Sequence, residues 1–428
     1  MENSTSRRYD IDWLRVMLFG LLIWYHYAVF SLDQLFENDN SYNFLNIPLF
    51  FILAVMHQWR LAALFVISGM GTAFALRSRT WKQYIQERCV RLGIPLIFGT
   101  YILFFGLFEL RNTTLLIFTI FPGSDLMPYG HLWFIYNLLI YSVLLTPLFF
   151  HIKGRPNGII VRIVQNVFNI KRGLGVLIIP PSILALNGIL FKPWAFGEVG
   201  MWWEFSRYLM YFLFGFLMIS VKEKYFSVLA EVRLPVSVLT PFLAILWFTI
   251  NENSDIPFIM EGGWVNRGYP AITTETVLAS FIQSFHSWFW CLFIFSWASK
   301  LLNKANMYLT YLNESVYPTY VVHMHLTFLP IAILSSLSIG YYTGMIIGTI
   351  FVLIGVFCCF EIVRRARFAR IIFGIKGYGN EIYQLFPYNS VNEKGLRIIL
   401  EIFFHILVLA LIIGLLVFLI IAGVISDL

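Results

Sequence analysis

The feature that most constrains this chain is a series of long apolar runs that recurs from one end to the other. Hydrophobic residues make up 59% of the sequence and charged residues only 12%, whereas about 25% of the residues of a soluble domain are charged. A helix needs about 20 consecutive apolar residues to cross a bilayer. The pattern therefore predicts an all-α, polytopic membrane protein, with the lipid bilayer as its first partner.

Eleven runs are long enough to cross the membrane, and we place them at 13–31, 47–76, 92–110, 132–151, 174–191, 204–221, 234–250, 271–298, 316–337, 343–363 and 400–425. The second run is long enough to be tilted or broken, and a break is expected at its polar patch, 57–60. No sizeable soluble domain separates the runs, so 1–428 is predicted to be one integral membrane domain. The segment 364–399 is predicted to be a basic cytoplasmic loop with one short surface helix.

The positive charges fall on one side of the predicted membrane. With a cytoplasmic N-terminus, the inner segments hold 24 of the 30 Lys and Arg residues, and the outer segments hold only Arg111, Lys192 and Arg267. Because excess positive charge marks cytoplasmic loops, we expect the N-terminus inside and the C-terminus, after an odd number of spans, outside. The same bias explains the net charge of +7, so no nucleic-acid partner is predicted.

The first run carries two ionisable side chains, Arg15 and His26, in apolar surroundings. Such groups are unfavourable in hydrocarbon and usually face a bundle interior or a wet cavity. In a helix, the two residues would lie about 20° apart on one face and about 16 Å apart along the axis. One long ligand could therefore contact both. Asp12, three residues before Arg15, is the expected ion-pair partner of that arginine.

Further candidates lie toward the outer side: His57, Arg60, Ser68 and His131. Arg60 sits at a depth similar to that of His26 and needs a polar or anionic partner, unless it snorkels to the outer headgroups. Taken alone, His131 is typical of an interfacial histidine. Ser68 is better suited to close helix packing than to nucleophilic catalysis, because no Gly-x-Ser-x-Gly turn surrounds it.

On the inner side, Arg88 and Arg91 share one face of a predicted helix and could grip a phosphate, although positive-inside charge also explains them. Near the ninth run, Glu314 and Pro318 precede His323, and proline in a membrane helix frees a carbonyl and can kink the helix near a ligand site. The sequence shows no zinc spacing, carboxylate pair or phosphate loop, so no metal is predicted. The ionisable groups in the spans are histidines and arginines, which can perform acid–base chemistry and bind anions.

The ordered motifs resemble those of the membrane acyltransferase-3 family over roughly residues 8–363. They are Asp10–Arg15 followed by His26, then Phe65–Gly69, Arg88–Pro95 and His131–Phe134. Arg60 and the segment Tyr311–His323 are most similar to the branch of periplasmic-glucan succinyltransferases. The family core commonly has ten spans, which makes 400–428 an additional C-terminal transmembrane helix. The family's His-Gln near the ninth span is His323-Met324 here.

The resemblance implies transfer of an acetyl or succinyl group from cytoplasmic acyl-CoA to a hydroxyl of an extracytoplasmic carbohydrate, such as a cell-envelope glycan, at the bacterial inner membrane. Acyl-CoA would be a donor substrate, with no permanently bound cofactor. His26 would be the general base, and the CoA phosphates would bind Arg15, Arg88 and Arg91. The acyl group or acceptor would meet a second set of residues: Arg60, His57, His131, Ser68, His323 and Glu314.

Two other functions fit the same residues. A secondary transporter of an anionic solute would use buried histidines and arginines to bind the anion and shuttle protons. A non-catalytic partner of other envelope-glycan synthesis proteins would need neither anion binding nor proton transfer. Dependence on acyl-CoA separates the predicted enzyme from both alternatives.

Overall fold

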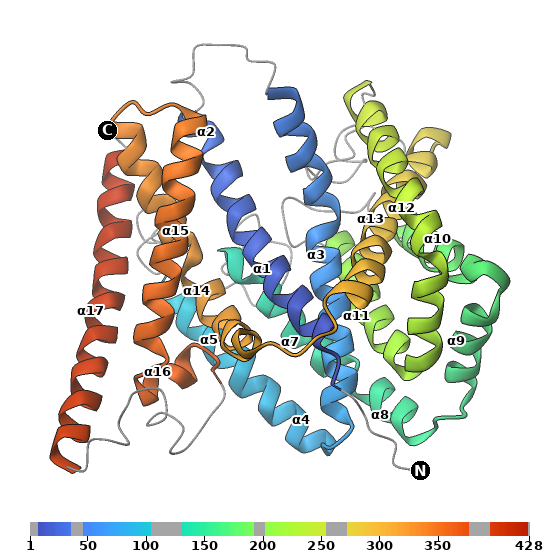
Figure 1. Ribbon diagram of the computed structural model, residues 1–428, viewed down its shortest axis with the longest axis horizontal. Coiled ribbons are helices and arrows are strands. Elements are labelled where there is room, and N and C mark those ends of the chain that lie inside the picture. The colour runs from blue at the N-terminus through green and yellow to red at the C-terminus, as the bar shows by residue number, and fades with distance from the viewer. Residues whose placement is uncertain are drawn as a thin grey trace.

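The chain forms a bundle of helices that run roughly side by side (Figure 1). The computed structural model describes residues 7–35, 46–103, 130–191, 202–253, 272–375 and 394–426, and no strand occurs within these ranges. The all-α, polytopic prediction is confirmed. The long helices are α1 (Tyr9–Phe30), α3 (Asn46–Leu76), α10 (Leu174–Phe191), α11 (Trp202–Ser220), α12 (Lys222–Asn253), α13 (Thr274–Leu301), α14 (Met307–Ser336), α15 (Tyr341–Val363) and α17 (Lys394–Ser426). The shorter ones are α2 (Leu32–Leu35), α4 (Trp81–Arg88), α5 (Ile94–Phe98), α7 (Trp133–Leu144), α8 (Thr146–Gly154), α9 (Ile159–Asn169) and α16 (Arg367–Ile372).

Eight of the described helices are long and apolar enough to cross a membrane, or nine if α7 and α8, which meet at an angle of 49°, form one bent span. Pro147 at the start of α8 accounts for the bend, because proline lacks an N–H and clashes with the preceding turn. The predicted count of eleven is not established. Predicted span 92–110 passes beyond Leu103 into residues outside the described part, and 204–221 coincides with α11, which is not among the eight.

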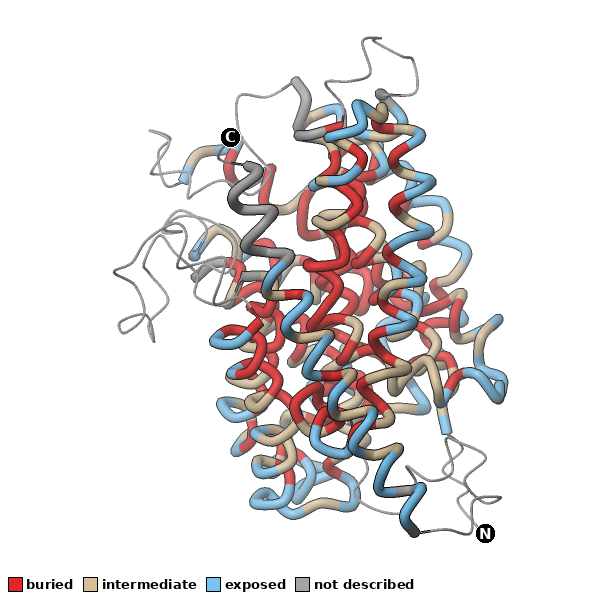
Figure 2. The backbone as a smooth tube through the Cα atoms, turned by 90° about the vertical axis from the view of Figure 1, so that its left-hand side faces the viewer, coloured by how far each residue is buried: buried red, intermediate tan, exposed pale blue. Residues whose placement is uncertain are grey.

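Helix α3 lies at the centre of the bundle and α17 at its edge (Figure 1). The most apolar stretch of α3 is 72% buried, against 11% for α17. Figure 2 shows this contrast as a column of buried residues inside a shell of exposed ones. Lipid tails are as apolar as leucine, so hydropathy alone does not distinguish a central helix from a peripheral one. The expected break at 57–60 does not occur, since α3 continues through this patch as one helix.

Glycines bring α3 and α11 into backbone contact. A Cβ atom on Gly69 would lie 1.9 Å from the carbonyl oxygen of Phe212, and one on Gly215 would lie 1.9 Å from that of Val66. Only hydrogen fits at either position. Ser68, beside Gly69, donates its hydroxyl to the Leu64 carbonyl at 2.8 Å. The packing role predicted for the Ser68-Gly69 pair is therefore confirmed for the glycine.

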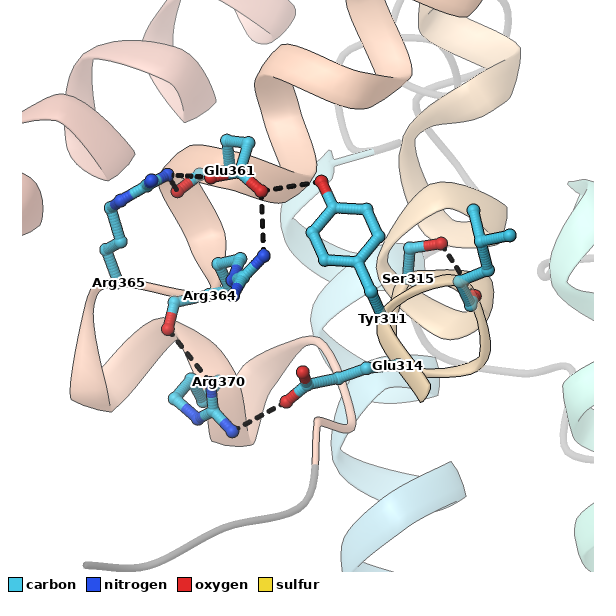
Figure 3. Close-up of polar contacts among 8 residues, drawn as sticks. Tyr311, Glu314, Ser315, Glu361, Arg364, Arg365 and Arg370 are labelled. Carbon is cyan, nitrogen blue, oxygen red and sulfur yellow. Dashed lines mark hydrogen bonds and ion pairs between the residues drawn. The ribbon is translucent and has the colours of Figure 1, made fainter. Parts of the chain in front are cut away.

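An ion-pair network joins α14, α15 and α16 (Figure 3). Arg370 donates to Glu314 at 2.7 Å, and Glu361 accepts from Tyr311 at 2.5 Å and from Arg364 at 2.8 Å. The short helix predicted within 364–399 exists as α16, with Arg367 and Phe368 exposed and Ala369, Arg370 and Ile372 buried. Its buried arginine, Arg370, pairs with a carboxylate of another helix, Glu314 of α14.

The first turn of α1 and the last turn of α17 lie at opposite ends of the bundle (Figure 1). Helices α4, α8 and α16 lie at the same end as the start of α1. We call this the inner end, because the predicted cytoplasmic loops lie there, and the opposite end the outer end. The arrangement suits an odd number of spans, and the orientation relative to the membrane stays a prediction.

Candidate active site

Helix α1 carries the residues from which the site is built. It is unbroken from Tyr9 to Phe30, so the two ionisable groups predicted to share one face are held about 16 Å apart by a rigid element. Arg15, toward the inner end, lies 3.5 Å from Asp12, which confirms the predicted i,i+3 pair. Its guanidinium also reaches Asn313 of α14 at 3.5 Å.

His26 meets a second imidazole, that of His323 on α14. The Nδ1 atom of His26 lies 2.8 Å from Nε2 of His323, and Nδ1 of His323 lies 2.6 Å from the Tyr320 carbonyl oxygen. His323 is fully buried, while His26 is partly exposed. The two predicted site residues are thus brought into direct contact, although 297 positions separate them.

His131 packs edge-on against His323, with ring centroids 4.9 Å apart. Its Nε2 atom lies 3.0 Å from the Tyr320 carbonyl oxygen, and the Tyr320 hydroxyl in turn donates to the His131 carbonyl. The interfacial setting expected for His131 taken alone stays a prediction, but its ring bonds to the backbone of α14. The sequence around His131 does not reveal that α14 supplies this acceptor.

Tyr25 connects a third part of the cluster. Its hydroxyl lies 3.0 Å from Nδ1 of His57, and the guanidinium of Arg60 lies over its ring at 3.3 Å. Arg60 is 2% exposed, so it does not snorkel to the headgroups. The prediction overlooked Tyr25, whose place beside His26 was the available signal.

A basic cavity opens at the inner end. Its volume is about 400 Å³, and its lining consists of Arg7, Arg8, Ile11, Asp12, Arg15, Gly71, Phe74, Arg77 and Lys222. Five cationic side chains therefore face one carboxylate. Gly71 makes room for Arg15, because a Cβ atom there would lie 3.1 Å from the guanidinium. Apart from Arg15, the sequence predicts these cations only as positive-inside charge, so the cavity is a finding of the structure.

Arg88 and Arg91 do not share one helix face as predicted. Arg91 lies in a turn of π-helix, Cys89–Gly93, which changes the angular step between the two residues. Arg88 donates to Thr72 of α3 at 3.1 Å, whereas the Arg91 guanidinium lies 5.5 Å from the Tyr317 ring of α14. Arg91 still lies close enough to Arg15 and Arg88 for their positive charges to repel.

The polar groups thus fall into two layers joined by α1, with the basic cavity at the inner end and the imidazoles, together with Arg60, farther along the helix. A family model described as an acyltransferase domain matches residues 8–364. The chain belongs to the acyltransferase-3 family. Its similarity to glucans biosynthesis protein C of Escherichia coli O81 (strain ED1a) is 22% identity over 387 residues, which cover 87% of this chain and 95% of the relative. No solved structure is significantly similar to the chain.

Acyltransferase-3 membership makes this protein a membrane acyltransferase, and it indicates which polar groups to consider for catalysis. The structure gathers five predicted site residues around α1: His26, His57, Arg60, His131 and His323. Ser68 and Glu314 bond elsewhere, as described above. Among the residues that the structure describes, no group of three or more His, Cys, Asp or Glu side chains is arranged to hold a metal ion.

Proposed function

We propose that this acyltransferase moves an acetyl or succinyl group from cytoplasmic acyl-CoA to a hydroxyl of an extracytoplasmic carbohydrate, and that it works in the bacterial inner membrane with its N-terminus in the cytoplasm. One observation carries the proposal. A single rigid helix places Arg15 in the lining of a basic cavity at one end and His26 in an imidazole cluster about 16 Å farther on. Donor and acceptor can then approach the reaction from opposite sides.

The basic cavity suits the phosphate groups of CoA. Guanidinium groups bind phosphate oxygens through two parallel N–H donors, which makes arginine well suited to phosphate recognition. Arg15, Arg77 and Lys222 would hold the phosphates, with Arg88 and Arg91 adding positive charge nearby. The pantetheine arm would run along α1 and carry the thioester toward His26.

His26 would act as the general base. It takes the proton of the acceptor hydroxyl while the hydroxyl oxygen attacks the thioester carbon; the new C–O bond forms, the C–S bond breaks, and the proton passes to the departing thiolate. The products are an ester and free CoA. Arg60, 2% exposed, would stabilise the oxyanion or an acyl carboxylate, since such a charge acts strongly where water is excluded. The similar Escherichia coli protein is named for glucan biosynthesis, which supports a carbohydrate acceptor.

Reconstituted protein tests this proposal. Purified protein in vesicles receives labelled acetyl-CoA or succinyl-CoA on one side and a glucan oligosaccharide on the other, and mass spectrometry follows ester formation. His26→Ala should slow transfer by about 100-fold or more, the usual contribution of a positioned base. His405→Ala is the matched control, because His405 lies on α17 and its Nδ1 atom lies 2.6 Å from the carbonyl oxygen of Glu401.

Two results would overturn the proposal. One is full activity of the His26→Ala variant. The other is accumulation of a labelled anion inside the vesicles with no ester and no need for acyl-CoA, which would make the protein a transporter.

A further inference from the structure

The two nitrogens of the His26 ring have different surroundings. In the described part of the chain, His26 makes one side-chain hydrogen bond, through Nδ1 to Nε2 of His323. The N···N distance of 2.8 Å is that of a hydrogen bond, so one nitrogen must carry the shared hydrogen. The ring planes differ by only 13°, as expected when two imidazoles meet edge to edge through an N–H···N bond. Nε2 of His26 stays available for another partner.

The backbone decides which nitrogen is the donor. A carbonyl oxygen can only accept, so Nδ1 of His323, 2.6 Å from the Tyr320 carbonyl oxygen, must carry a hydrogen. A neutral imidazole has one hydrogen on nitrogen, which leaves Nε2 of His323 as an acceptor. Nδ1 of His26 must then be the donor in the bond between the rings. It follows that Nε2 of neutral His26 carries no hydrogen and can take a proton.

We infer that His323 is a positioning residue, which holds His26 in the Nδ1–H tautomer and so directs its basic Nε2 atom toward the acceptor hydroxyl. The inference rests on the proposed function only for the identity of that hydroxyl. When Nε2 takes a proton, His26 becomes an imidazolium whose Nδ1–H still points at the lone pair of His323. That hydrogen bond to a charged group is stronger than the one it replaces.

The acceptor that orients His323 is itself fixed. The Tyr320 carbonyl also accepts from Nε2 of His131 at 3.0 Å, and the Tyr320 hydroxyl donates to the His131 backbone. These reciprocal contacts tie α14 to the segment that begins at Gly130. Rotation of the His323 ring would break its bond to Tyr320, so the ring orientation that makes Nε2 the acceptor is built into the helix contact.

Two substitutions at this position differ in the atom that matters. The side-chain oxygen of His323→Gln can accept from Nδ1–H of His26. The leucine of His323→Leu is similar in size but has no acceptor. His325→Leu is the matched control, because His325 is a buried histidine on the same helix that bonds to the Leu103 carbonyl. Size-exclusion profiles and thermal melting in detergent establish which variants are folded.

Two measurements are made on each folded variant. Solid-state NMR of ¹⁵N-histidine-labelled protein in lipid reports the tautomer, with the His26 signals identified by their loss in His26→Ala. Steady-state kinetics gives kcat and KM for donor and acceptor. We expect the Nδ1–H tautomer in the wild type, in His323→Gln and in His325→Leu, and a shift to the Nε2–H tautomer in His323→Leu. In that variant kcat should fall by about 100-fold, while both KM values change by less than about threefold.

The inference is overturned if His26 of the wild type is the Nε2–H tautomer, or if His323→Leu leaves tautomer and kcat unchanged. If His323→Leu does not fold, the wild-type tautomer decides, because the positioning role requires the Nδ1–H form of His26. The NMR result does not depend on turnover. A wild type that transfers no acyl group from any donor would therefore refute the proposed function and leave the positioning role to be judged by the tautomer alone.

Discussion

Arg60 is an arginine buried without enough acceptors for its hydrogens. It is 2% exposed and lies over the Tyr25 ring, yet its Nε and Nη1 atoms have no hydrogen-bond partner among the described residues. Leaving buried donors unpaired destabilises a fold, more so for charged groups. Functional sites retain such groups when a ligand completes them. We therefore expect Arg60 to contribute to function rather than to stability.

Arg60→Met tests this separation. The substitution removes an incompletely paired buried charge, so the melting temperature should stay unchanged or rise. If the guanidinium stabilises developing negative charge, kcat should fall by about 100-fold or more. The matched variant is Arg207→Met, whose arginine is also buried but donates to the Gln58 carbonyl at 3.3 Å. It should lower the melting temperature. A fall in stability for Arg60→Met with normal kcat would contradict the assignment.

Arg77 and Lys222 should act on the donor. Each lines the basic cavity, and the loss of one hydrogen bond to a charged phosphate is typically about 1.5–3 kcal/mol, or roughly tenfold or more in affinity. Arg77→Gln or Lys222→Gln should raise the KM for acyl-CoA by about that factor, with kcat little changed. With acyl-dephospho-CoA, which lacks the 3′-phosphate, the KM values of the wild type and the variants should differ less. Equal KM values for wild type and variants would remove these residues from the donor site.

At the residue scale, the sequence predicts local relations well and distant ones poorly. The Asp12–Arg15 pair and the common face of Arg15 and His26 follow from helical periodicity alone. The contact between His26 and His323 depends on how α1 and α14 pack, which no periodicity contains. The prediction that Arg88 and Arg91 share one helix face fails because of a turn of π-helix, Cys89–Gly93, which the apolar pattern does not reveal.

At the scale of elements, helix packing in this bundle depends on small residues as much as on apolar ones. Membrane helices gain little from the hydrophobic effect when they associate, so close van der Waals contact has to hold them together. Gly69 and Gly215 supply that contact between α3 and α11. The sequence indicates the glycine on α3 but not its counterpart, since 146 positions separate them.

Gly215→Ala should therefore lower the melting temperature by several degrees. The new Cβ atom would meet the Val66 carbonyl oxygen at 1.9 Å, and the two backbones would have to separate. Gly20→Ala on α1 is the control, because a Cβ atom there meets nothing within 4 Å. Thermal melting in one detergent compares the two. Equal melting temperatures would show that α3 and α11 can move apart freely.

For the molecule as a whole, apolar runs predict the helical class and most of the long helices, while the number of spans depends on bends and on segments that the structure does not describe. Orientation rests on charge. If the inner end faces the cytoplasm, exposed positions at the two ends should react with a membrane-impermeant maleimide from opposite sides. Lys82→Cys on α4 and Ser336→Cys at the end of α14 provide such positions in a background without other cysteines.

In right-side-out vesicles, we expect Ser336→Cys to be labelled at once and Lys82→Cys only after permeabilisation. The reverse pattern would place the basic cavity on the outside, away from cytoplasmic acyl-CoA. Labelling of both positions from one side would contradict the placement of Lys82 and Ser336 at opposite ends of the bundle.

The bond between His26 and His323 also bears on how the chain is made. Helix α1 leaves the ribosome before α14, which follows after nearly 300 further residues. Until α14 has been made, His26 lacks the His323 imidazole and Arg15 lacks the Asn313 side chain. The residues that suit the finished protein for chemistry are thus the ones that lack their partners while the chain is being made.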